Sequence, residues 1–284
     1  MTKEKINIQD FVNELRQNEN SERTIKKYTR EINQFLQYVK VEYKDELSSD
    51  KVLNYKDYLK SNYKVASTNN KIVIVNKFIS FLFADDMDKA EKLKVKQLKV
   101  QTKNTLENVL SESDYQRLLR TAQKKGKIDM YYLMMTLANT GIRISELKYI
   151  TLEAVQKGQT TIENKGKQRT IVISKSLAKD LKNYCKEANI TSGIIFKSRN
   201  NKPLDEAYIY KQIQWISGQA RVNKAKAHPH SFRHLFAKQF LTISDNVMAL
   251  ADILGHSSLN TTRIYTKTSS NEQRALIDKM YTRS

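Results

Sequence analysis

Residues 140–147 read Thr-Gly-Ile-Arg-Ile-Ser-Glu-Leu, and they follow an apolar run that starts at Tyr131. Apolar residues before the glycine recur at helical spacing, so we expect a helix that stops near Gly141. Arg143 comes directly after this stop, where a second helical turn can begin with Ile144. The stretch therefore predicts an α-rich domain that holds an arginine at the end of a helix.

The chain around this stretch combines helical patterns with a single hairpin. Residues 160–163 and 169–173 are rich in threonine and isoleucine and predict two short strands, joined by a turn at Lys165-Gly166-Lys167. Helical patterns flank the hairpin and cover residues 115–122, 132–137, 177–184, 209–216, 232–240 and 247–254, with further short helices expected from Ser258 and near residues 275–280.

The first part of the chain predicts a separate bundle of helices. Residues 1–125 contain no glycine and residues 1–202 contain no proline, so helices can run there without interruption. Four stretches between residues 6 and 84 have apolar residues at helical spacing, and serines precede three of them: Ser21, Ser48 and Ser67. Four short amphipathic helices of this kind form a small bundle.

The charge balance indicates a polyanionic partner. The 284 residues include 50 lysines and arginines against 30 acidic residues, a net charge of +20. Residues 1–100 carry +5 of this charge and residues 101–284 carry +15. Nucleic acid or an anionic membrane surface would attract such a protein, and solubility alone is the simpler alternative. No apolar run approaches the ~20 residues that span a membrane, and the N-terminus does not resemble a signal peptide.

A lysine-rich segment separates the two helical patterns. Residues 89–103 hold six lysines and one acid, and they show no apolar face wide enough for a core. We expect an N-terminal domain at residues 1–88, a basic linker at residues 89–104 and a C-terminal domain at residues 105–284. Such a charge run is either simply solvated or, between two basic domains, crosses a nucleic-acid backbone.

Several kinds of chemistry are disfavoured by the composition. Cys185 is the only cysteine, so no internal disulfide can form, which fits a reducing cytoplasm. One cysteine and four histidines do not supply the paired spacings of a zinc site, and no Walker-type loop or GxGxxG is present. The acids Asp85, Asp86 and Asp88 are expected to face solvent rather than a metal. No metal or cofactor is expected.

Breaking a phosphodiester bond without a metal requires particular side chains. Arginine can neutralise the charge that grows in the transition state, because its planar fork binds two phosphate oxygens. A general acid must protonate the leaving oxygen, and a nucleophile that forms a covalent phosphoester keeps the bond energy for rejoining. Tyrosine suits the last role if a base or a cationic site offsets its usual pKa of ~10.

The sequence contains such residues in a fixed order. His230 and Arg233 lie three apart on one face of a helix that begins after Pro229. The complete set of candidates is Arg143, Lys165 on the hairpin turn, His230, Arg233, His256 at a helix corner and Tyr265. Lys167 on the same turn remains an alternative to Lys165, and His228 and His234 are expected to be structural.

This set resembles the tyrosine recombinases, also called the phage-integrase family, whose signature is Arg…Lys…His-x-x-Arg…His/Trp…Tyr. The motifs TGxRxSEL, the Lys-Gly turn, HxxRH and LGHxxxxTTxxY all match, and the resemblance covers about residues 6–281. It implies a mostly α fold, in which an N-terminal four-helix, SAM-like bundle binds the core site. An α-rich catalytic domain with a small β-hairpin would follow.

The resemblance also implies a role for each residue of the cleavage step. Arg143 and Arg233 would clamp the scissile phosphate. Tyr265 would attack it, giving a 3′-phosphotyrosyl link, and Lys165 would protonate the leaving 5′-oxygen. A 5′-hydroxyl from a partner strand would then attack the phosphotyrosine and restore the backbone without a cofactor.

Three further residues would assist, and the resemblance names the partners. His230 would help proton transfer at the tyrosine, and His256 would hydrogen-bond a non-bridging oxygen. Glu146 would support the residues that contact the phosphate. The expected partner is a double-stranded DNA core site, with four protomers on two sites at synapsis and accessory DNA sites or proteins as further candidates. The segment after Tyr265 would dock on a neighbouring protomer.

The expected function is a site-specific recombinase that resolves transposon co-integrates or DNA dimers. The core-binding pattern starts near Ile6, which leaves no space for the extra N-terminal domain of many integrases. The alternatives are an integrase or excisionase of a mobile element, a DNA relaxase like type IB topoisomerases, and a catalytically silent DNA-binding protein.

Overall fold

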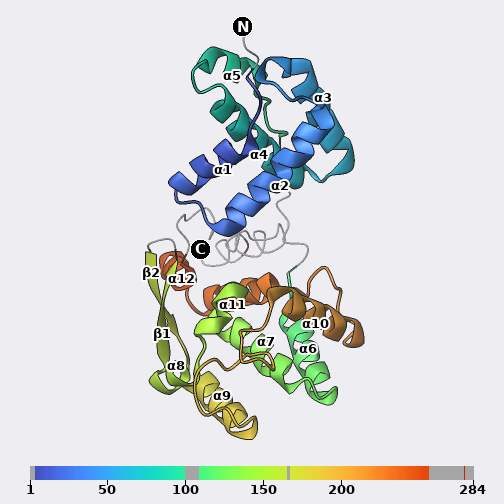
Figure 1. Cartoon of the computed structure of the whole chain (residues 1–284). Helices are drawn as coiled ribbons and strands as arrows, with labels where there is room; N and C mark the ends of the chain where they lie inside the picture. The colour runs from blue at the N-terminus through green and yellow to red at the C-terminus, as the bar shows by residue number, and fades with distance from the viewer. Residues whose placement is uncertain (1–3, 100–108, 165–166, 256–277, 279–284) are drawn as a thin grey trace. The chain divides into compact units, whose positions relative to one another are not determined.

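The computed structural model describes residues 4–99, 109–164, 167–255 and 278, and Figure 1 shows the chain. The chain divides into two compact units, Met1–Lys103 and Asn104–Ser284, which we call the N-terminal and C-terminal units. Both are mostly helical, and the one sheet among the described residues is a two-stranded antiparallel hairpin. The expected α-rich fold with a small hairpin is confirmed. No helix within the described ranges is long and apolar enough to cross a membrane.

The N-terminal unit contains the four expected helices and one more. Their bounds are α1 (Ile8–Gln17), α2 (Glu22–Val39), α3 (Ser49–Asn62), α4 (Val65–Leu82) and α5 (Met87–Leu93), with a 3₁₀ turn, η1 (Lys44–Glu46), before α3. The side chains of Ser21 and Ser48 cap α2 and α3 as predicted, by accepting backbone N–H groups. Ser67 is not a cap, because α4 begins two residues earlier.

Three phenylalanines from different helices lie in the largely aliphatic core of this unit. Phe11, Phe35 and Phe78 come from α1, α2 and α4, and each is 0% exposed. The rings of Phe11 and Phe78 meet edge to face with centroids 5.1 Å apart, an arrangement that the ring quadrupoles favour. The apolar residues that predicted helices in the sequence are thus the residues that these helices bury.

Part of the segment that we expected to be a linker is folded onto the N-terminal unit. Helix α5 buries Ala90 and Leu93, and Val95 beyond it is also buried. Apolar spacing did not predict this packing, because lysines separate the three buried positions. The segment 94–98, which we call the strap, begins in an extended conformation at Lys94 and forms no helix or strand.

Two asparagines of α4 hold the strap by its main chain. Asn76 donates to the carbonyl of Val95 (2.9 Å) and accepts from its N–H (3.1 Å). Asn69 makes the same pair of bonds with Leu98, at 2.9 and 2.7 Å. Seven helical residues rise ~10 Å and three extended residues span ~10 Å, so the two amides match every third residue of the strap.

Replacing both Asn69 and Asn76 with alanine should release the strap. Each main-chain bond contributes on the order of 1 kcal/mol, so hydrogen exchange at the amides of Val95 and Leu98 should rise by about tenfold or more. Exchange in α2 should stay unchanged. Asn70→Ala, at an exposed position of the same helix, is the matched control. Unchanged exchange at both amides in the double variant would contradict the assignment.

The C-terminal unit holds the remaining elements. The helices are α6 (Glu112–Lys124), α7 (Ile128–Thr140), α8 (Leu152–Lys157), α9 (Lys175–Glu187), α10 (Glu206–Gln219), α11 (Pro229–Ile243) and α12 (Val247–Leu254), and a 3₁₀ segment, η2 (Ile144–Tyr149), follows α7. The strands are β1 (Gln159–Asn164) and β2 (Lys167–Val172). The helical turn expected after Gly141 is therefore 3₁₀, and α8 is an element that the pattern did not predict.

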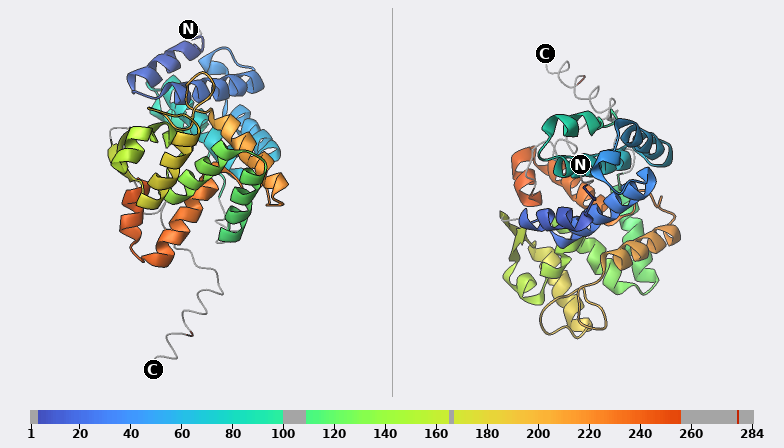
Figure 2. Two further views of the ribbon diagram at one scale, coloured as in Figure 1. Left: turned by 90° about the horizontal axis from the view of Figure 1, so that it is seen from below. Right: turned by 45° about the horizontal axis from the view of Figure 1, so that its top comes forward.

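Helix α7 is the centre of this unit. It contacts α6, α9, α10 and α11 (Figure 1). Leu133 and Leu137 on it are fully buried. The hairpin lies at one side of the unit beside α8 and α12, as Figure 2 shows from two further directions. In the hairpin Ile162 pairs with Arg169, so the two side chains share one face of the sheet. This face is directed to the interior, where Ile162 and Ile171 are buried.

Candidate active site

The candidate site forms where α12 ends. The last carbonyls of a helix have no partner within the helix and need donors from elsewhere. Gly255 adopts a left-handed conformation (φ +64°), and its N–H bonds back to Ala251 and Asp252. The carbonyls of Ile253, Leu254 and Gly255 accept no hydrogen bond from the helix itself. They are bonded instead by side chains from other elements.

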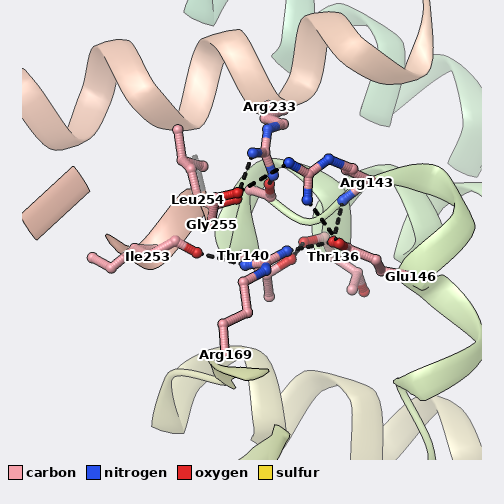
Figure 3. Close-up of polar contacts among 10 residues, drawn as sticks. Thr136, Thr140, Arg143, Glu146, Arg169, Arg233, Ile253, Leu254 and Gly255 are labelled. Carbon is pink, nitrogen blue, oxygen red and sulfur yellow. Dashed lines mark hydrogen bonds and ion pairs between the residues drawn. The ribbon is translucent and has the colours of Figure 1, made fainter. Parts of the chain in front are cut away.

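Three arginines donate hydrogen bonds to these three consecutive carbonyls, one arginine to each carbonyl (Figure 3). Arg169 of β2 donates to Ile253 (2.5 Å), Arg233 of α11 to Leu254 (2.6 Å) and Arg143 to Gly255 (3.2 Å). Cations are also favoured here by the partial negative charge at a helix C-terminus. We call these three arginines with Glu146 the arginine cluster.

Arg233 is the most deeply buried member of the cluster. Its side chain is only 1% exposed, and besides Leu254 it donates to the carbonyl of Gly141 (2.6 Å). Gly141 has φ +61° and ends α7. Arg233 therefore joins the ends of α7 and α12 through one guanidinium group.

Glu146 is the acid of the cluster and is also buried. One carboxylate oxygen accepts from the backbone N–H of Arg143 (2.7 Å) and from the guanidinium of Arg169. The other oxygen accepts from Arg143 Nη1 at 3.0 Å. Burial lowers the pKa of Arg169 and Glu146 opposes this shift, but an arginine remains charged at any physiological pH. Three guanidinium groups and one carboxylate leave a net charge of +2 in the cluster.

Arg143 is the most accessible arginine of the cluster. Its side chain is 36% exposed, against 12% for Arg169. Figure 3 shows its guanidinium group directed toward that of Arg233. Two fixed guanidinium groups that converge, one of them open to solvent, can bind two oxygens of a single anion.

His230 lies in the first turn of α11, one turn before Arg233. Partial burial lowers its pKa, and the positive charges of Arg233, His228 and Arg143 add to the effect. Its imidazole ring meets that of His234 edge to face at 4.5 Å. His230 is exposed, so a neutral imidazole is presented at the surface of the site at neutral pH.

The structure brings together part of the predicted site. Arg143, Glu146 and Arg233 share the cluster, and His230 precedes Arg233 on the same helix. The other predicted residues lie outside the described residues: Lys165, His256 and Tyr265. Lys167 is the first residue of β2, and its backbone pairs with Asn164 beside the turn. The choice between Lys165 and Lys167 stays open.

The remaining sequence predictions concern residues away from the cluster. Asp86 caps α5 by accepting the N–H of Lys89 (2.9 Å), and no group of three metal-ligating side chains occurs in the described part of the chain. His228 precedes α11 as its N-cap residue, where burial lowers its pKa. Cys185 is buried in α9, and burial raises the pKa of its thiol.

Arg169 is the member of the arginine cluster that sequence reasoning missed. It stands in a predicted strand near a lysine-rich turn, where a basic side chain is usually solvated. The one available signal was strand alternation, because Arg169 lies two residues before the buried Ile171 and shares its face.

Comparison with known proteins gives the same family over both units. Residues 108–272 match the phage integrase family, and residues 8–86 match its N-terminal SAM-like domain. The chain is 25% identical to tyrosine recombinase XerA of Pyrococcus furiosus over 96% of this chain and 93% of that protein. It is 27% identical to TnP I resolvase of Bacillus thuringiensis, over 90% and 93%.

A solved structure has the same fold. The XerH site-specific recombinase bound to its difH substrate in a pre-cleavage complex matches with a TM-score of 0.69 at 21% identity. The match covers 89% of this chain and 78% of that chain. The likeness extends over both helical units.

A helical N-terminal unit followed by an α-rich unit with an arginine cluster is the organisation of a tyrosine recombinase. Since the family match covers more than half of its residues, this chain belongs to the phage integrase family. The resemblance inferred from the ordered motifs is thereby confirmed, and so is the SAM-like N-terminal domain.

Gly141→Ala should destabilise the C-terminal unit by about 2–4 kcal/mol. A positive φ disfavours alanine by about 1 kcal/mol, and a Cβ there would lie 2.5 Å from Phe236 and 2.8 Å from Leu254, which adds an overpacking cost. Chemical denaturation monitored in this unit measures the change. Gly126→Ala is the control, because its φ is +66° but nothing lies within 4 Å of its Cβ. Equal losses in both variants would refute the packing argument.

Proposed function

We propose that this protein is a site-specific recombinase that cleaves and rejoins double-stranded DNA through a 3′-phosphotyrosyl intermediate on Tyr265. The observation that supports it best is the convergence of Arg143 and Arg233 at the end of α12, where Gly255 lies ten residues before Tyr265 in the chain. Both guanidinium groups bond neutral backbone carbonyls there. A phosphate can replace these acceptors, because charge-assisted hydrogen bonds are roughly twice as strong as neutral ones.

The proposed chemistry conserves the number of phosphoester bonds. The Tyr265 hydroxyl attacks phosphorus, the bond to the 5′-oxygen breaks, and Lys165 or Lys167 gives that oxygen a proton. Arg143 and Arg233 neutralise the charge that develops on the non-bridging oxygens. A 5′-hydroxyl of the partner strand then attacks the phosphotyrosine and frees Tyr265, so no external energy source is needed.

Two histidines complete the proposed mechanism. His230 accepts the tyrosine proton, which its lowered pKa allows because the imidazole is neutral at pH 7. His256 hydrogen-bonds a non-bridging oxygen. The roles of Lys165, His256 and Tyr265 rest on the family resemblance, since these residues lie outside the described ranges.

The proposed substrate is a DNA core site that the two units bind from two sides. The net charge of +20 supports a nucleic-acid partner, and the solved relatives include recombinases bound to DNA. In this proposal residues 1–88 and 105–284 form the two DNA-binding domains, and four protomers on two sites form the synapse, held by the segment after Tyr265. The similarity to TnP I resolvase and XerA supports the resolution of co-integrates or DNA dimers.

A suicide-substrate assay tests the function. A core site is first recovered by binding selection from a pool of random duplexes, and a nicked duplex of that site is then incubated with the protein in chelator. We expect a protein–DNA adduct that survives denaturation and maps to Tyr265, because the short fragment that carries the new 5′-hydroxyl diffuses away at the nick and cannot attack the phosphotyrosine. Tyr265→Phe should bind the duplex with equal affinity and form no adduct.

A supercoiled plasmid with two directly repeated sites separates the possible outcomes. Two product circles would support resolution. Relaxation of the plasmid without exchange would favour a type IB topoisomerase-like enzyme. Absence of any adduct on a site that the protein binds would refute the proposed chemistry.

The cleavage rate should depend on pH through His230. Its lowered pKa places the acid limb of the rate, measured at subsaturating DNA, below pH 6.5, since protonation removes the base. His230→Gln should abolish this limb and lower the plateau by about 100-fold or more. His228→Gln, whose imidazole belongs to the N-cap residue of α11, should retain the limb. An unchanged acid limb in His230→Gln would assign the proton transfer to another group.

A further inference from the structure

Arg169 occupies a position that the predicted site did not include. Its guanidinium group is nearly buried and joins two partners that lie far apart in the chain, the carboxylate of Glu146 and the carbonyl of Ile253. Its side chain also packs on Gly255, where a Cβ would collide with it. A surface arginine of a hairpin would show none of these contacts.

The bond from Arg169 to the carbonyl of Ile253 holds the end of α12. If a phosphate draws Arg143 and Arg233 away, the carbonyls of Gly255 and Leu254 lose donors. The side chain of Arg169 is only 12% exposed, so it can keep its bond to the carbonyl of Ile253 while the phosphate binds the other two arginines. One arginine can therefore hold the end of α12 while the other two change partners.

The ion pair between Arg169 and Glu146 affects the charge that Arg143 presents to a phosphate. The Glu146 carboxylate bonds both the N–H and the guanidinium of Arg143, so it orients that arginine but also competes with an incoming phosphate for it. Arg169 shares the same carboxylate and compensates its charge. With this compensation Arg143 keeps its orientation and retains more positive potential for an anion.

We infer that Arg169 is a positioning residue for strand cleavage, which fixes the end of α12 and compensates Glu146 so that Arg143 and Arg233 can exchange carbonyls for phosphate oxygens. The inference rests on the proposed function. It goes beyond the catalytic set, because Arg169 acts through these residues and touches no substrate. The planar guanidinium is needed, since it donates in two directions at once, whereas a lysine ammonium offers one compact charge.

The first test uses the full-length protein without DNA. In Arg169→Gln, amides in the last turn of α12, from Leu250 to Gly255, should exchange about tenfold faster or more, because a hydrogen bond and a packing contact are lost. Exchange in α9 should remain unchanged, and Arg169→Lys should lie between the two proteins. Arg120→Gln on the exposed side of α6 is the control with the same charge change.

The second test measures adduct formation on the nicked duplex in a single turnover. Arg169→Gln should slow cleavage by about 10- to 100-fold while the dissociation constant for the site changes less than about threefold, because a displaced catalytic group costs rate rather than binding. Glu146→Gln in the same background should restore at least about fivefold of the rate, since it removes the uncompensated charge. Arg169→Lys, which keeps the charge, should retain intermediate activity.

The outcomes separate this inference from the proposed function. No adduct from the wild type would refute the function, while the exchange experiment would still test the anchoring of α12. A normal cleavage rate in Arg169→Gln would overturn the inference, and so would a loss that follows site affinity alone. Failure of Glu146→Gln to restore any rate would also overturn it, because Arg169 would then not act by compensating that charge.

Discussion

A buried guanidinium group must be given hydrogen-bond acceptors, and this requirement organises the C-terminal unit. Arg233 meets it with carbonyls at the ends of two helices, α7 and α12. Within a helix only the carbonyls of the last turn lack a partner, so the left-handed glycines at 141 and 255, which end these helices, are part of the same arrangement. The burial of Arg233 therefore depends on where α7 and α12 end.

The same arrangement prepares the site for an anion before any anion binds. The arginines are already held in place by neutral acceptors and by one carboxylate, so binding exchanges partners rather than ordering side chains. Preorganisation of this kind reduces the reorganisation needed in the transition state. It also explains why the cluster contains a buried acid, because Glu146 fixes the direction of Arg143 through both its main chain and its side chain.

Local signals in the sequence predicted most of the fold. Helical spacing located α1 to α4 and α7, the threonine- and isoleucine-rich runs located the hairpin, and Gly141 marked the end of α7. Arg143 and Arg233 were found through ordered motifs, because no local property distinguishes them from surface arginines. Arg169 could not be found in this way, since its burial depends on a helix end 84 residues later in the chain. The strap was missed for the same reason, because Asn69 and Asn76 bond distant main-chain atoms and leave no pattern. Helix α5 was missed because lysines separate its buried apolar positions.

The strap has a consequence for how this protein can change over generations. Asn69 and Asn76 bond main-chain atoms, so apart from the buried Val95 the side chains of residues 94–98 can drift without loss of the attachment. A single inserted or deleted residue would instead move Leu98 out of step with its asparagine. Selection on this segment should therefore act on its length more than on its composition.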